Sequence, residues 1–303
     1  MSSFLQLIKI YSPANIAREV YYSYLQPKDH AMAVGEFYDK HHQDFLEVYG
    51  ELIQAFRTGD IEEILDYELK SIDISPEMKV LDAGCGVGRP ALHFAQKSGA
   101  QIEAISISQR QVDHAHRLKS KFSTENVSFT KLDYHSIQEH FGNDQFDRVY
   151  FLESFGHSTK KRQLLKGVWD VLKPGGEVYI KDLFCRVTDN RKDQKVINRE
   201  IAKINQQYHY EVSDLTQLLD MVRKIGFVLK LVKTIDIKLE SFENLTISNK
   251  FQELTGIYKI DSFEGYIFPV DFLEVKLYKP AFNMEEAKDR YFLQNLFHKN
   301  IRS

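Results

Sequence analysis

The chain contains 303 residues, of which 43% are hydrophobic and 27% are charged, and its formal net charge is −3. These values are typical of a soluble globular protein, and the lack of a basic excess argues against a nucleic-acid partner. Cys85 and Cys185 are too few for a disulfide framework or a zinc site, which fits a reducing compartment. The first 13 residues are too short and too polar for a signal peptide or a membrane span. We therefore expect a cytoplasmic protein without stable membrane insertion.

Residues 14 to 70 carry apolar residues at three- and four-residue spacing, notably in 14–22 and 50–56, which predicts helices. From Lys79 to Lys181 the pattern changes to short apolar strands that alternate with helical segments. The predicted strands are 78–82, 101–106, 127–131, 146–152 and 176–182, and the predicted helices are 89–98, 109–121, 135–140 and 159–172. Such alternation predicts βαβ units and a parallel sheet.

Residues 186–207 are strongly polar and predict an exposed loop that leads into a helix ending near 208–210. A further helix begins near Ser213 and ends at Gly226, and strands follow over 228–237 and 268–278. We therefore expect three parts: an N-terminal helical cap (1–70), an α/β core (71–185), and a C-terminal part (186–303) that adds core strands and cap helices. The expected fold is a Rossmann-like, doubly wound sheet of seven mostly parallel strands.

The most informative stretch, VLDAGCGVGRP, runs from Val80 to Pro90 and joins a strand to a helix through a glycine-rich turn. Such a turn lets the backbone approach a ligand, and α/β sheets bind nucleotide-like molecules there. The spacing is not the G-x-G-x-x-G of dinucleotide sites, and no Lys-Ser or Lys-Thr follows as in a P-loop. The pattern D-x-G-C-G-x-G resembles the first binding motif of the S-adenosylmethionine (SAM) dependent methyltransferases. This resemblance implies a cofactor site that includes Asp82, Gly84, Cys85, Gly86 and Gly88.

The end of the second strand departs from most of that family, in which an acidic residue holds the ribose. Here the chain has Ser106, Ile107 and Ser108, followed by Gln111, a pattern similar to the cyclopropane fatty acid synthases and sterol C-methyltransferases. The resemblance implies that hydroxyl and amide groups bind the ribose, and Ser108 is also expected to cap the following helix.

Two further positions complete the cofactor site that the resemblance implies. Asp133 at the end of the third strand would accept from the adenine amino group, with Tyr134 beside the ring. Asp82 is expected to be ionised and to accept from the SAM ammonium or from structural amides.

The segment after the fourth strand is expected to face the methyl group that is transferred. Its E-S-x-x-H pattern, Glu153 to His157, resembles the site segment of sterol, tocopherol and terpenyl C-methyltransferases. The resemblance implies that Glu153 is a general base or an anion that stabilises a carbocation, and that it also lies against the cofactor. The structural alternative is a carboxylate that only satisfies local amides or an arginine.

Aromatic residues and a histidine complete this predicted site. Tyr208 and Tyr210 are candidates for aromatic faces near a cation, and His157 for a catalytic group. Tyr38 lies in a segment similar to the lead segment of sterol methyltransferases, where this position closes over the cofactor.

The expected reaction is C-methylation of an isoprenoid alkene through a carbocation, with a prenyl diphosphate such as geranyl or farnesyl diphosphate as acceptor. The chain after residue 197 loosely resembles geranyl diphosphate C-methyltransferases, which implies Mg²⁺ with Arg or Lys, without ligands assigned to positions. One alternative is O- or N-methylation of a metabolite with His157 or His209 as base. Another is a SAM-binding fold without catalysis. The expected partner is a small hydrophobic substrate, and a homo-oligomer stays open.

Overall fold

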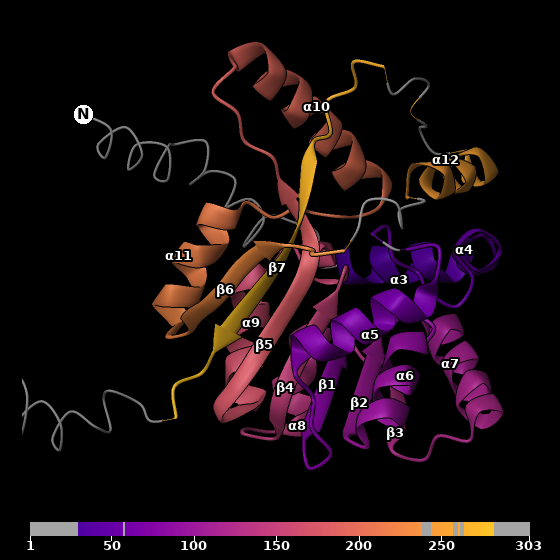
Figure 1. The fold of residues 1–303 in the computed structure, drawn as a ribbon, viewed down its shortest axis with the longest axis vertical. Helices are drawn as coiled ribbons and strands as arrows, with labels where there is room; N and C mark the ends of the chain where they lie inside the picture. The colour runs from indigo at the N-terminus through magenta and orange to yellow at the C-terminus, as the bar shows by residue number, and fades with distance from the viewer. Residues whose placement is uncertain (1–29, 57, 238–243, 257–259, 261–263, 282–303) are drawn as a thin grey trace, which may run out of the picture.

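The computed structural model describes residues 30–56, 58–237, 244–256, 260 and 264–281. Its centre is a seven-stranded sheet in the order β3-β2-β1-β4-β5-β7-β6 (Figure 1). Strand β7 is antiparallel to both of its neighbours, and the other pairs are parallel. The strands are β1 (Lys79–Ala83), β2 (Gln101–Ser106), β3 (Val127–Lys131), β4 (Phe146–Leu152), β5 (Leu172–Cys185), β6 (Val228–Thr234) and β7 (Val270–Tyr278). The Rossmann-like, mostly parallel sheet that the sequence predicts is confirmed.

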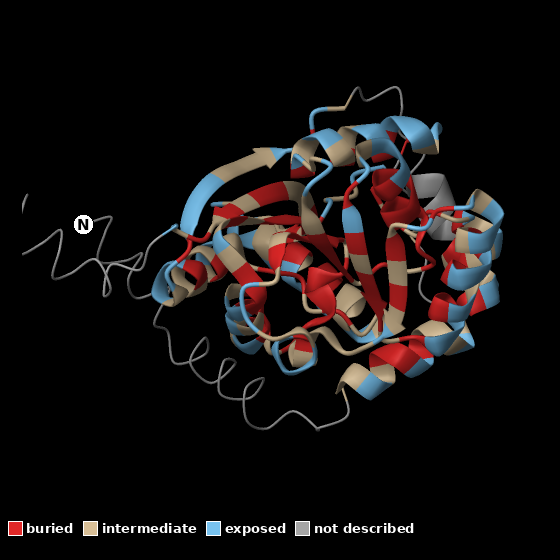
Figure 2. Cartoon of the chain, turned by 90° about the horizontal axis from the view of Figure 1, so that it is seen from below, coloured by how far each residue is buried: buried red, intermediate tan, exposed pale blue. Residues whose placement is uncertain are grey.

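Helices cover both faces of the sheet, and the strands are therefore apolar on both sides. Val80 of β1 packs with helices α5, α6 and α7, whereas Leu81 and Ala83 pack with α8, α9 and α11. Figure 2 shows the buried residues concentrated on the strands and on the inner faces of the helices. These helices are α5 (Ile61–Ile72), α6 (Arg89–Ser98), α7 (Gln109–Phe122), α8 (Ile137–Phe141), α9 (Lys161–Val171) and α11 (Leu215–Ile225).

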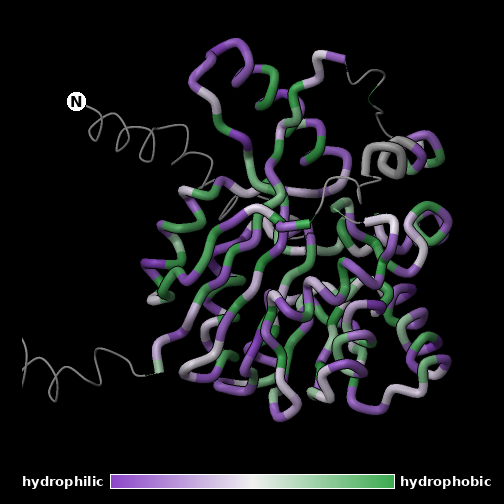
Figure 3. The backbone as a smooth tube through the Cα atoms, viewed as in Figure 1, coloured by the Kyte–Doolittle hydropathy of each residue, from purple (hydrophilic) through white to green (hydrophobic). Residues whose placement is uncertain are grey.

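Further helices lie beyond the carboxyl ends of the parallel strands. Helices α3 (His30–Lys40), α4 (His42–Tyr49) and α12 (Asn244–Thr255) lie together on one side (Figure 1). Phe45 of α4 stacks on Phe251 of α12, with ring centroids 4.3 Å apart. Helix α10 (Arg191–Gln207) is largely hydrophilic (Figure 3) and begins at the capping residue Asn190. Within the described residues, no helix combines the length and apolar character that a membrane crossing needs.

Most element predictions agree with the structure to within a few residues, but the helix expected over 50–56 is wrong. This segment is irregular because its backbone is used by buried side chains: the amides of Ala55 and Phe56 donate to Glu153, and the Phe56 carbonyl accepts from Lys181. Strand β5 begins at Leu172, before the predicted start at 176, and Gly175 and Gly176 pair with Lys279. The helix predicted over 14–22 lies outside the described residues.

Candidate functional site

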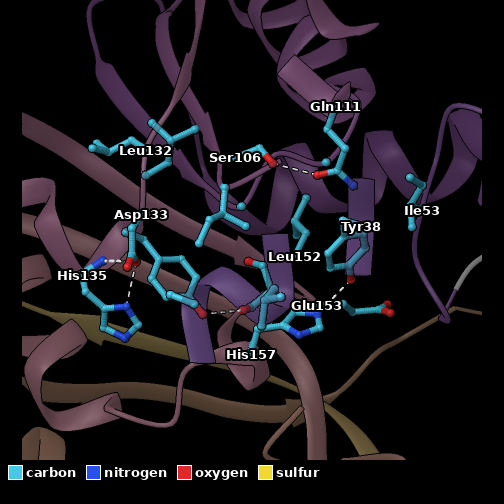
Figure 4. Close-up of a pocket in the computed structure, with 18 residues that line it drawn as sticks. Tyr38, Ile53, Ser106, Gln111, Leu132, Asp133, His135, Leu152, Glu153 and His157 are labelled. Carbon is cyan, nitrogen blue, oxygen red and sulfur yellow. Dashed lines mark hydrogen bonds and ion pairs between the residues drawn. The ribbon is translucent and has the colours of Figure 1, made fainter. Parts of the chain in front are cut away.

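An open cavity, with about 680 Å³ of empty space including open solvent, lies at the carboxyl ends of β1, β2 and β4, under helix α3 (Figure 4). In this fold, that edge of the sheet is where ligands bind. Eighteen described residues line the cavity, and ten of them are predicted site residues: Tyr38, Gly84, Gly86, Ser106, Ile107, Gln111, Asp133, Tyr134, Glu153 and His157. A smaller hollow beside it is lined by Asp82 and Cys85, among others. Ile53, Gly84, Gly86 and Leu152 line both, so the two hollows meet at the glycine turn.

The glycine turn is shaped for close approach of a ligand. Gly86 has φ +53°, and a Cβ placed there would point into open space that borders both hollows. Gly84 and Gly88 are required for packing instead, because a Cβ would come within 2.4 Å of Ser154 and 2.7 Å of Phe129, respectively. Gly88 does not line either hollow and starts helix α6. Gly86 thus exposes backbone to a ligand, whereas Gly84 and Gly88 allow the turn to pack closely against its neighbours.

The polar residues after β2 form one hydrogen-bonded group. The Ser108 hydroxyl caps α7 by accepting from the Gln111 amide at 3.1 Å, as predicted. The Ser106 hydroxyl donates to the Gln111 side-chain oxygen at 2.7 Å, which leaves the Gln111 NH₂ group as a donor in the cavity lining. Ser108 does not line the cavity, because its hydroxyl binds Asp39 of α3.

The opposite end of the cavity carries a chain of three side chains. Asp133 is 2.7 Å from His135 Nδ1, and His135 Nε2 is 2.8 Å from the Ser158 hydroxyl. Although burial opposes it, His135 lowers the pKa of Asp133, so this carboxylate is ionised and fits an amino-group donor. Tyr134 lies beside it in the lining. Ser158 is fully buried outside the cavity and orients His135.

Asp82 lies in the smaller hollow, where its carboxylate accepts from the Tyr150 hydroxyl at 2.9 Å. Burial raises the pKa of Asp82 to about 8. Burial thus opposes the ionised form that the sequence predicts, and a cation that comes close would favour it. The site fits an ammonium group, whose arrival would restore the anion.

Glu153 lines the larger hollow, next to Leu152, which lines both, and has an uncommon left-handed conformation with φ +56°. Its carboxylate accepts from the Ala55 amide at 2.5 Å, the Phe56 amide at 3.0 Å and Lys181 Nζ at 3.0 Å. Its own amide donates to the Lys181 carbonyl, which fixes the residue against β5. All of these partners are donors that hold the carboxylate in place, so Glu153 is suited to the electrostatic stabilisation of a cation.

Lys181 of β5 is fully buried and is the hub of a polar cluster. Besides Glu153, its Nζ donates to Glu68 at 2.9 Å, to the Gln54 side-chain oxygen at 2.5 Å and to the Phe56 carbonyl at 3.0 Å. Burial alone would lower the pKa of Lys181, but the two glutamates raise it. Burial raises the pKa of Glu68, while Lys181 and Gln54 oppose that shift by donating to its two oxygens.

Tyr38 and His157 form a hydrogen-bonded pair in the cavity lining (Figure 4). His157 Nδ1 lies 3.0 Å from the His209 carbonyl, which only accepts, so Nδ1 carries the proton. Nε2 then accepts from the Tyr38 hydroxyl at 2.8 Å. Burial lowers the pKa of His157 to about 4 and raises the pKa of Tyr38, so the pair is neutral around pH 7.

Tyr208 and Tyr210, predicted as catalytic aromatics, are not among the described lining residues. Tyr210 packs edge-on against His157, and its hydroxyl donates to the buried Asp182. Tyr208 packs in the aromatic cluster of α4 and α12. The structure thus places both tyrosines behind the lining, where Tyr210 can orient His157.

Gln54, Glu68 and Lys181 of this cluster were not predicted from the sequence. A signal was present for two of these residues. Glu68 falls on the apolar stripe of α5 with Ile64 and Ile72, and Lys181 interrupts the apolar strand β5. A charged residue at a core position of a periodic pattern indicates a buried partner of opposite charge.

The chain matches a family model described as a methyltransferase domain over residues 74–224. Among curated proteins, it is 36% identical over 118 residues to Methyltransferase GfsG of Streptomyces halstedii, covering 39% of this chain and 42% of that protein. It is 34% identical over 136 residues to Sterol 24-C-methyltransferase erg-4 of Neurospora crassa (45% and 35%). It is 29% identical over 235 residues to O-methyltransferase cnsE of Penicillium expansum (74% and 80%). The match thus spans less than half of the first two relatives.

Solved structures show the same fold at low identity. The [4+2]-cyclase SpnF has a TM-score of 0.68 at 19% identity, with 83% of this chain and 97% of that chain covered. A geranyl diphosphate methyltransferase in complex with GPP and sinefungin has a TM-score of 0.64 at 13% identity (82% and 99%). With the glycine turn, the sheet order and the family match in agreement, residues 74–224 of this chain are a methyltransferase domain with the fold of the class I SAM-dependent enzymes.

Proposed function

We propose that this protein transfers a methyl group from SAM to an alkene carbon of a small isoprenoid, with a carbocation formed on the acceptor. The observation that carries the proposal is the Glu153 carboxylate in the lining of a cavity whose walls also include seven apolar residues. A fixed anion in a dry site stabilises a cation strongly. The sterol 24-C-methyltransferase relatives and the fold of the geranyl diphosphate methyltransferase support this reaction class. The apolar lining residues are Ala31, Val34, Ile53, Ile105, Ile107, Leu132 and Leu152.

Bound SAM would supply an electrophilic methyl group on a sulfonium. The residues that would hold it are the glycine turn, Gln111 and Asp133 for the nucleoside, and Asp82 for the ammonium. Attack by the acceptor double bond leaves a cation on carbon, and a C–H proton next to that carbon must depart to restore the alkene. Tyr38 Oη would take this proton while passing its own to His157 Nε2, along the hydrogen bond that already joins them.

The pKa values of this pair favour carbon over oxygen as the methyl acceptor. A histidine whose pKa is about 4 and a tyrosine whose pKa is raised form a weak base for an ordinary hydroxyl group. They are sufficient for a carbocation, whose neighbouring C–H proton is strongly acidic. O-methylation stays the second candidate, because the relative cnsE, an O-methyltransferase, aligns with 74% of this chain.

The diphosphate part of the expected substrate is not kept in the proposal. None of the described lining residues is Lys or Arg, and the described residues include no group of three or more His, Cys, Asp or Glu placed to hold a metal. Lys, Arg or a bound metal ion commonly holds a diphosphate. We therefore propose an isoprenoid without a charged head group.

The test uses SAM with a ¹³C-labelled methyl group and three acceptor classes: uncharged isoprenoid olefins, prenyl diphosphates with and without Mg²⁺, and phenols. We expect a product from the uncharged olefins whose NMR spectrum places the label on carbon. Label found only on oxygen or nitrogen would contradict the proposal in favour of the second candidate. Turnover confined to diphosphates would contradict the neutral head group.

A further inference from the structure

We propose that the buried cluster of Glu68, Lys181 and Glu153 carries a net single negative charge and makes the site prefer the cationic cofactor SAM over its neutral product, S-adenosylhomocysteine (SAH). This inference rests on the proposed use of SAM. It assigns a role to Glu68 and Lys181, neither of which lines the cavity.

The hydrogen-bond directions show that the polar groups around both carboxylates are donors. Lys181 can only donate, so the Gln54 side-chain atom that it contacts is the oxygen, and the Gln54 nitrogen faces Glu68 Oε2 at 3.3 Å. Glu68 Oε1 accepts from Lys181 at 2.9 Å. Both oxygens of Glu68 thus accept hydrogen bonds from donors, and these bonds favour the ionised form against the effect of burial.

Glu153 is likewise surrounded by donors, because its two oxygens accept from the Ala55 amide, the Phe56 amide and Lys181 Nζ. Two carboxylates therefore share one ammonium. Lys181 and Glu68 are fully buried and the Glu153 side chain is only 6% exposed, so water screens the surplus charge weakly.

The surplus charge faces the junction of the two hollows. Glu153 follows Leu152, and it binds the backbone of Ala55 and Phe56, close to Ile53; Leu152 and Ile53 each line both hollows. A ligand with a nucleoside at one end and an amino acid at the other would cross this junction with its middle. In SAM that middle is a sulfonium cation, and in SAH it is an uncharged thioether.

Discrimination follows because only the cation gains from the surplus charge. A fixed anion next to the sulfonium would strengthen SAM binding on the order of tenfold and leave SAH binding almost unchanged. Such a preference helps the product to leave after each turnover.

The test compares Kd values for SAM and SAH, measured by calorimetry, in the full-length protein and in Glu68→Gln. This change removes one charge without altering a lining residue, and the amide oxygen can keep the bond to Lys181. We expect SAM to bind about tenfold more weakly and SAH within twofold of the original. Glu63→Gln, an exposed charge removed from the same helix α5, is the matched control and should change neither Kd.

Equal weakening of both ligands would overturn the inference, because it would show that the cluster only maintains shape, and so would no change in either. If Glu68→Gln does not fold, Glu153→Gln must lower the SAM-to-SAH preference in the same direction. A wild-type protein that binds neither ligand would instead refute the cofactor assignment of the proposed function, which distinguishes the two failures.

Discussion

Tyr38 Oη lies 2.8 Å from His157 Nε2, and this hydrogen bond joins helix α3 to the turn that follows β4. The bond connects two segments 119 residues apart, both of which line the cavity. Helix α3 and the turn after β4 are therefore held together. The proton transfer of the proposed mechanism runs along this same hydrogen bond.

Tyr38→Phe is expected to lower turnover by roughly 10²-fold, because it removes the hydroxyl through which a proton reaches His157. The Kd for SAM should change little, because the ring stays in place. Steady-state and binding measurements on the same preparation would check both statements. Tyr278→Phe, at the end of β7 and outside the cavity lining, is the control and should match the wild type.

Glu153→Gln is expected to lower turnover at saturating SAM on the order of 10²-fold or more, because the amide no longer stabilises the cation. Alternative products of the cation, such as alcohols formed by water capture, should become a larger share. Product analysis by mass spectrometry measures this distribution. Normal turnover would remove Glu153 from the mechanism and favour transfer to oxygen or nitrogen.

Gly86→Leu and Gly88→Leu should separate binding from folding. A side chain at Gly86 meets no atom within 4 Å, so apart from about 1–2 kcal/mol for the left-handed φ the variant should fold, and it should lose SAM binding. A side chain at Gly88 meets Phe129 and Ala115 in the core, so that variant should lose stability, by about 1–3 kcal/mol or more. Thermal unfolding and calorimetry read the two effects independently. SAM binding retained in Gly86→Leu would contradict the placement of the cofactor.

SAM binding should release a proton at neutral pH. Burial raises the pKa of Asp82 to about 8, and the SAM ammonium would favour the ionised carboxylate. Affinity should therefore rise with pH up to about 8 and then level off. Calorimetry in buffers of different ionisation enthalpy counts the released protons, and Asp82→Asn should remove this contribution. An unchanged proton count in Asp82→Asn would place the ammonium elsewhere.

His157 should make the free energy of unfolding depend on pH. Burial lowers its pKa from 6.5 to about 4, so the unfolded chain binds more protons between these values and stability is lost as pH falls through that window. Between pH 7 and pH 5 the loss amounts to about 2 kcal/mol. Asp182, whose pKa burial raises to about 6, acts in the opposite sense.

The measurement therefore compares urea unfolding of the wild type and of His157→Gln, in which Asp182 is common to both. The stability advantage of the wild type over the variant should shrink by about 2 kcal/mol from pH 7 to pH 5. A difference that stays constant would show that His157 titrates normally in the folded protein.

The sheet and the cofactor turn could be predicted because their signals are local. Strand and helix periods, the glycine turn and the Ser108 cap all lie within short stretches, and the structure agrees with each. Residues 50–56 could not be placed, because helix periodicity within this stretch does not reveal that Glu153 and Lys181, about 100 residues away, use its backbone groups. Long-range polar contacts of this kind leave no periodic trace.

The sequence also does not reveal which of the predicted site residues line the cavity and which support them from behind. Tyr38 and Tyr210 are both tyrosines near predicted cap segments, and only the folded chain shows Tyr38 in the cavity and Tyr210 behind His157. The raised pKa of Asp82 likewise depends on how completely the surrounding chain excludes water.

Strand β5 carries Lys181 and Asp182 side by side, and strand alternation sends them to opposite faces of the sheet. Lys181 donates to the Gln54 side chain and the Phe56 carbonyl, whereas Asp182 accepts from the Gly156 amide and the Tyr210 hydroxyl. A slip of one residue would put a carboxylate among two glutamates and an ammonium against an amide donor. Only the observed register of β5 gives both charged side chains partners, so the register that completes the sheet also completes the site.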